Sequence, residues 1–227
     1  MRTVWAACLL AGCLGAATGD LESARDRQDR AALERAVAER AAAAGKTPQD
    51  AEAQYRLALA SSYLAEVALE LRDKAQAQRA AEAGVKAADR AIALKPDNAE
   101  YHRVLGTLCG QVIPANVLAG LTYGKRARDA VDKALQLDPK SARAWLARGV
   151  GNYYLPSAFG GGATLAIADF RKAIQLDPPY ADAWLWLGLG LRKENHNAEA
   201  RKAFAKALEL DPDRIWTKQQ LEKTPPQ

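Results

Sequence analysis

The spacing of apolar residues predicts helices along almost the whole chain of 227 residues. Leu21 to Ala44 has helical spacing, is rich in Ala, Arg and Glu, and contains no helix breaker, so a single helix is predicted there. Ala dominates the apolar residues and aromatic residues are only 7%, which favours close helix packing and an all-α fold. The other predicted helices are Gln49–Leu71, Lys74–Leu94, Ala99–Gly110, Thr122–Leu137, Ala142–Tyr154, Thr164–Leu176, Ala181–Lys193, Ala198–Leu210 and Arg214–Lys223.

Four prolines divide the predicted helices into pairs. Pro96, Pro139, Pro178 and Pro212 each follow a Leu-Asp or Leu-Lys step, at intervals of 43, 39 and 34 residues. The last interval is the length of one helix–turn–helix repeat. Such repeats form an extended binding surface, so this spacing indicates binding and not a reactive centre.

The last pair carries the clearest repeat pattern. Gly188 is small enough to let the partner helix approach closely, and Phe204 stands between two alanines on the facing helix. The positions that define the pattern are Trp184, Leu187, Gly188, Leu191, Ala200, Phe204, Ala207 and Pro212. This pattern resembles the tetratricopeptide repeat (TPR) family.

Two earlier pairs show the same pattern with five and nine extra residues in the turn between their helices. The middle pair has Trp145, Gly149, Ala166, Phe170, Ala173 and Pro178, and the first has His102, Leu105, Gly106, Ala127, Val131, Ala134 and Pro139. The resemblance implies a right-handed TPR superhelix, an α-solenoid, over residues 99–227 with a C-terminal capping helix. Residues 27–98 match the pattern loosely and are assigned to a divergent helical region, in which the helix before Gly45 is either half of a degenerate pair or a cap.

The N-terminus has the layout of an export signal. Arg2 precedes a short apolar run, and Leu10-Ala11-Gly12-Cys13 resembles the lipobox of bacterial lipoproteins. That resemblance implies a signal peptide at 1–12, cleavage before a lipidated Cys13, a tether at 13–26 and delivery to the outer membrane facing the periplasm. The alternative is cleavage after Ala17-Thr18-Gly19, which releases a soluble periplasmic or secreted protein.

Little in the sequence suggests an enzyme. His102 takes a packing position and His196 lies in a turn, and neither has further ligands at metal-binding spacing. Cys109 is expected to be a small buried thiol. We therefore predict a non-enzymatic protein without cofactor or metal. Basic and acidic residues, 32 and 27 in number, are spread evenly, so no nucleic-acid partner is predicted.

The predicted functional surface is the concave wall, which in this family consists of the first helix of each pair. With Trp145 and Trp184 as packing positions, a step of 100° per residue directs an apolar, aromatic and basic set of side chains into the groove. This set consists of Arg103, Arg143, Leu146, Val150, Tyr153, Tyr154, Leu185, Trp186, Leu189, Arg192 and Lys193. It suits a protein or peptide partner, so the hypothesis is a scaffold in a cell-envelope complex.

Two alternatives stay open at this point. The extra turn residues around Ile113 and at Leu155–Phe159 could fill the groove themselves. A closed cavity lined by Leu146, Val150 and Leu185 would instead indicate a periplasmic subunit that binds a small ligand or lipid and serves a solute transporter.

Overall fold

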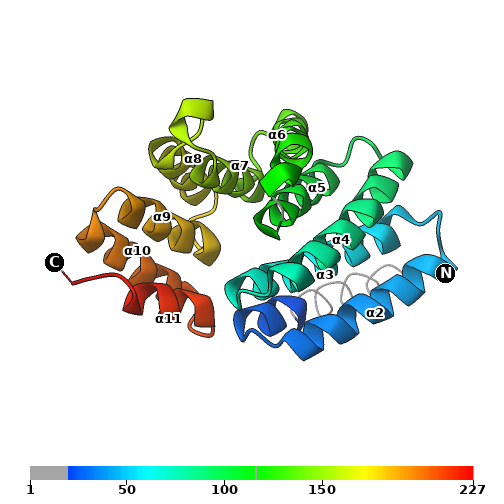
Figure 1. Ribbon diagram of the computed structural model, residues 1–227, viewed down its shortest axis with the longest axis horizontal. Coiled ribbons are helices and arrows are strands. Elements are labelled where there is room, and N and C mark those ends of the chain that lie inside the picture. Colours follow the sequence, from blue (N-terminus) through cyan, green and yellow to red (C-terminus); the bar gives the residue numbers. More distant parts are fainter. Residues whose placement is uncertain (1–19, 116, 227) are drawn as a thin grey trace, which may run out of the picture.

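The computed structural model describes residues 20–115 and 117–226, and in these residues all regular secondary structure is helical, which confirms the all-α fold class. The helices follow one another as hairpins around a ring (Figure 1). The long helices are α2 Arg30–Lys46, α3 Ala51–Glu70, α4 Lys74–Leu94, α5 Ala99–Val112, α6 Gly120–Leu137, α7 Ala142–Tyr154, α8 Ala163–Leu176, α9 Ala181–Lys193, α10 Asn197–Leu210 and α11 Ile215–Glu222. Short 3-10 turns occupy Ile113–Ala115, Val117–Ala119 and Ser157–Phe159.

The single helix predicted from Leu21 to Ala44 is wrong, because the chain turns at residues 27–29. Residues 20–26 form a short helix, and α2 begins after Asp29, whose carboxylate accepts a hydrogen bond from the backbone N–H of Ala32 at 2.9 Å. Gln28 takes a positive φ of 52°, as Arg72 (65°) and Asn195 (64°) do in the α3–α4 and α9–α10 turns. Residues 20–46 are therefore a helical hairpin with a short first helix, and the segment 20–26 is folded where the sequence indicated a tether.

The C-terminal hairpins pack phenylalanines against glycines. Phe170 and Phe204 have no exposed surface, and each ring lies over a glycine of the preceding helix. A Cβ at Gly149 would lie 2.5 Å from Cε1 of Phe170, and one at Gly188 would lie 2.6 Å from Cε1 of Phe204. These contacts confirm the predicted close approach between the two helices of each pair.

A repeated hydrogen bond fixes the turn between hairpins. The indole N–H groups of Trp145 and Trp184 each donate to the proline carbonyl six residues earlier, both at 2.9 Å. His102 places Nε2 2.7 Å from the carbonyl oxygen of Pro96 in the same arrangement. Histidine therefore substitutes for tryptophan in the first of these pairs because both rings carry an N–H at the required place.

The chain curves with the first helix of each hairpin on the inside. These helices contact one another in sequence, α3 with α5, α5 with α7 and α7 with α9. The curve closes, because the capping helix α11 lies beside residues 20–26 at the start of the array (Figure 1). Two core clusters, one centred on α3–α5 and one on α7–α10, are linked along the chain by a small cluster between α6 and α7.

The long turn at 155–162 stays on the surface. Gly160 (φ 82°) and Gly162 (φ 113°) have left-handed backbone, which glycine adopts without steric cost. Phe159 is 70% exposed, whereas Leu155 is half-buried. Phe159 therefore does not fill the groove in this structure.

Candidate protein-interaction site

Four aromatic side chains from three helices form a continuous cluster at the inner side of the C-terminal hairpins. The ring of Trp186 on α9 has its centroid 5.7 Å from that of Tyr153 and 6.1 Å from that of Tyr154, both at the end of α7. Tyr153 and Tyr154 are 5.0 Å apart with their planes at 89°, an edge-to-face pair. Tyr154 is 67% exposed, whereas Tyr153, Trp186 and Trp216 are half-buried, so Tyr154 is the ring of this cluster that is open to solvent.

The fourth member, Trp216, comes from the capping helix and was missed by the sequence reasoning. Its ring is 5.6 Å from that of Trp186. Because Trp216 follows Pro212, the sequence assigns it to the capping helix. The step of 100° per residue was applied only to the first helix of each pair, so it made no statement about Trp216. The signal that could have found it is that a capping helix must lie over the inner and outer helices of the last hairpin together.

The predicted cations at the end of α9 are held by neighbouring groups. Lys193 lies 4.3 Å from the centroid of the Tyr153 ring and also donates to the backbone carbonyl of that residue. Arg192 donates to the side chain of Gln220 at 2.8 Å and to the hydroxyl of Thr224 at 3.2 Å. Arg192 therefore fixes the capping segment, while Lys193 stays exposed beside the aromatic cluster.

The predicted apolar wall is mostly buried. Leu146, Leu185 and Leu189 are 7%, 1% and 4% exposed and belong to the C-terminal core, so they do not face a partner in this structure. Val150 is half-buried. The aromatic cluster, and not the leucines, supplies the accessible apolar surface.

The other two arginines of the predicted set, Arg103 and Arg143, lie near the opposite end of the inner helices. Arg103 donates to both carboxylate oxygens of Glu100, at 2.7 and 2.6 Å. Arg143 is 3.5 Å from the carboxylate of Glu22 and lies over the ring of Tyr180. The structure thus separates the predicted set into an aromatic end and an arginine end, both on inner helices.

Residues 20–26 join the start of the array to its last hairpin. Leu21 and Ala24 are 3% and 5% exposed and belong to the N-terminal core. Arg25 donates to Asp182 on α9 at 2.7 Å and lies over the ring of Tyr63 on α3. The first helix of the array therefore contacts the last hairpin directly.

A buried ionic cluster completes this closure, and the sequence patterns did not predict it. Arg214, at the start of the capping helix, is 2% exposed, and its guanidinium donates to Glu66 at 2.7 Å. The same guanidinium also binds both oxygens of Glu70. Its Nε lies 3.7 Å from Asp26 and 3.9 Å from Asp182.

Burial changes the acidity of this cluster. Loss of solvent raises the pKa of Glu66 to about 7, despite the nearby guanidiniums of Arg25 and Arg214. Burial also acts on Asp182, but there the two guanidiniums outweigh it and hold the pKa below its ordinary value. Glu66 therefore holds its proton more tightly in the folded protein than an ordinary glutamate does.

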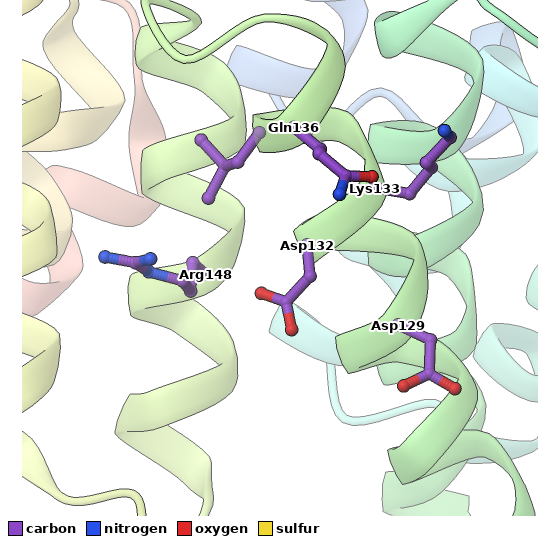
Figure 2. Close-up of a pocket in the computed structure, with 6 residues that line it drawn as sticks. Asp129, Asp132, Lys133, Gln136 and Arg148 are labelled. Carbon is purple, nitrogen blue, oxygen red and sulfur yellow. The ribbon is translucent and has the colours of Figure 1, made fainter.

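Two surface hollows lie over the outer helix α6, away from the aromatic cluster. The larger, about 530 Å³, lies between α6 and α7, with Asp132 and Arg148 on opposite walls (Figure 2). The smaller, about 280 Å³, includes His102 and Arg126. Neither includes Leu146, Val150 or Leu185, the residues expected to line a ligand cavity.

Reactive groups are few in the described part of the chain. Cys109 is fully buried, as expected, and burial raises the pKa of its thiol to about 11, which makes it a poor nucleophile. No group of three or more His, Cys, Asp or Glu side chains among residues 20–115 and 117–226 is placed to hold a metal ion. In those same residues, no helix has the length and apolar character that crossing a membrane demands.

Sequence comparison agrees with this architecture. The tetratricopeptide repeat pattern matches residues 181–214, which form α9, α10 and the turn before α11. The chain is thus a TPR-type α-solenoid, a class that is typically non-enzymatic. It belongs to the family described as Regulator of microtubule dynamics protein 1-3, whose pattern matches residues 20–156. A search of curated protein sequences found no match.

Solved structures share the fold at low sequence identity. TTC0263, a thermophilic TPR protein of Thermus thermophilus, superposes with a TM-score of 0.64 at 21% identity, covering 86% of this chain and 91% of its own. The HusA haemophore from Porphyromonas gingivalis gives a TM-score of 0.54 at 22% identity, covering 74% and 92%. These similarities support the helical solenoid and say nothing of the ligand.

Proposed function

We propose that this protein is a non-enzymatic scaffold that binds a protein partner through the aromatic cluster of Tyr153, Tyr154, Trp186 and Trp216. The TPR-like fold implies a protein–protein interaction scaffold. We choose this surface because Tyr154 is exposed within a cluster of packed rings. Clustered aromatic side chains contribute much of the energy of protein interfaces, and Lys193 adds a charge at their edge.

Partner capture with matched variants tests the surface. Tyr154→Ala alone, and together with Trp186→Ala, should remove partners that the unaltered protein retains. Phe159→Ala is the control, because Phe159 is equally exposed but lies on the 155–162 turn outside the cluster. An identical set of partners with the double variant would exclude the aromatic cluster.

We further propose that the chain is exported to the cell envelope and anchored in the outer membrane by lipid on Cys13. Support comes from the sequence alone, and Cys13 lies outside the described residues. Mass spectrometry of the mature N-terminus distinguishes a lipid-modified Cys13 from a chain that begins at Asp20.

The family match raises an alternative to the export proposal, in which the chain stays inside the cell and its partner is the microtubule. The net charge of +5 favours association with an acidic surface. Co-sedimentation with polymerised tubulin at two salt concentrations tests this candidate. Binding that falls with salt would support it, and absence of the protein from the pellet at both concentrations would exclude it.

A further inference from the structure

The buried ionic cluster has the form of a binding site with its ligand in place. Three carboxylates, Asp26, Glu66 and Glu70, come from the N-terminal hairpins, and the guanidinium that they surround comes from Arg214 at the far end of the array. The backbone carbonyl of Arg25 also lies 3.4 Å from Nη1 of Arg214. Arg214 thus enters an acidic pocket that the other end of the array provides.

The fit is specific for a guanidinium group. The Nη1 and Nη2 atoms of Arg214 bind the two oxygens of Glu70 side by side, and Nη2 also reaches Glu66. A guanidinium can bind both carboxylate oxygens in this way because its N–H donors form a planar fork, whereas the single ammonium nitrogen of lysine cannot. Glu70 is itself held by the amide of Gln28 at 2.8 Å, so the pocket is preorganised from its own side.

The contact is not fully satisfied. Nε of Arg214 is buried without a hydrogen-bond partner. A buried ion pair with imperfect geometry contributes little net stability, because the cost of removing both charges from water offsets their attraction. Such a contact joins two surfaces specifically while leaving them able to separate.

We propose that Asp26, Glu66 and Glu70 form a guanidinium-binding pocket whose resident ligand is Arg214, and that an arginine of a bound partner replaces Arg214 and opens the ring. The proposal rests on the function suggested above, since the replacing arginine belongs to the partner. Tethered Arg214 has a high effective concentration in the pocket, so free arginine does not displace it. The competing arginine must come from a partner that is already held, for example at the aromatic cluster.

Chemical rescue of the full chain tests the pocket without any partner. Arg214→Ala should raise backbone amide exchange in residues 21–26 and in α11 by about tenfold or more, because the ring loses its closing contact. N-acetyl-L-arginine amide at millimolar concentration should restore much of the protection. N-acetyl-L-lysine amide, of equal charge, should not.

Two further variants keep the test decisive. Arg214→Lys retains the charge and replaces Arg214→Ala if that variant fails to fold. It should also increase amide exchange in residues 21–26 and in α11. Arg201→Ala is the matched control, since Arg201 donates to the backbone carbonyls of Leu221 and Thr224 and touches no carboxylate. Its exchange should not respond to the arginine derivative.

Three results would overturn the pocket: no rescue by the arginine derivative, equal rescue by the lysine derivative, or wild-type exchange in Arg214→Lys. The outcomes can be told apart from those of the partner-capture experiment, because the Tyr154 and Trp186 variants keep Arg214, its carboxylates and Trp216, the ring of the cluster over which the Arg214 guanidinium lies. A failed rescue therefore does not bear on the aromatic surface. If N-acetyl-L-arginine amide restores protection, a captured partner should lose binding when its arginines are replaced by lysine. Unchanged binding would refute the proposal that a partner arginine replaces Arg214.

Discussion

The two cores of this protein solve the same packing problem with different residues. The N-terminal core brings α3 and α4 together through alanines such as Ala58 and Ala81, which have no exposed surface. The C-terminal core uses phenylalanine rings seated on glycines. The comparison shows that the hairpin geometry does not require the aromatic pattern by which repeats of this class are recognised.

The largest expected effect comes from the C-terminal core. Phe204→Ala removes a fully buried ring and should lower the free energy of unfolding by about 3–5 kcal/mol. Because Phe204 packs within its own hairpin and the ring closure is the one long-range contact of that hairpin described above, amide exchange should rise in α9 and α10 far more than in α3 and α4. Equal acceleration in both halves would show that the two cores unfold as one unit.

The ring closure is the next contact to break. Arg214→Met leaves Glu70, whose side chain is 3% exposed, buried without its counter-charge, so the free energy of unfolding should fall by about 3 kcal/mol or more. Urea denaturation is the suitable measurement, because guanidinium would itself enter the pocket. As a control, Lys125→Met breaks an exposed pair with Asp129 and should change stability by less than about 1 kcal/mol.

The closure should also depend on pH. The folded protein raises the pKa of Glu66 from 4.5 to about 7, so it binds the proton more tightly than the unfolded chain. The resulting stabilisation is fully present below about pH 4.5 and is lost as the pH rises through about 7. Relative to Glu66→Gln, which cannot ionise, the wild type should lose about 1–3 kcal/mol between pH 5 and pH 8. A difference that stays constant with pH would contradict this assignment.

The smallest effect compares two glycines on α7. Gly151 has open space around it, so Gly151→Ala should raise the free energy of unfolding by about 0.5–1 kcal/mol through helix propensity. Gly149→Ala places a methyl group against the Phe170 ring and should instead destabilise by about 1–3 kcal/mol. Thermal denaturation of the two variants checks the opposite signs.

Sequence periodicity predicted the helices and their pairing well, because the residues that define the repeat lie close together in the sequence. The register of Trp184, Gly188 and Phe204 was correct for the same reason. The break at Gln28 was missed, since a positive φ there is stabilised by contacts with Glu70 and Gln219 that are distant in sequence. Local patterns carry no record of such contacts.

The candidate site was predicted in part. Helical geometry placed Tyr153, Tyr154 and Trp186 together, as the structure does. It also directed Leu185 into the groove, because a rotation of 100° per residue cannot say how far a neighbouring hairpin overlaps the wall. The cluster around Arg214 depends on the curvature summed over all the hairpins, which no single pair encodes.

The hydrogen bonds from Trp145, Trp184 and His102 to proline carbonyls have a practical consequence for engineering. They anchor the turns between hairpins at one edge of the array. The nine and five additional residues of this chain fall at the other edge, within the hairpins. That opposite edge is the natural place to graft an epitope or a reporter peptide, because lengthening it leaves the anchored joints unaltered.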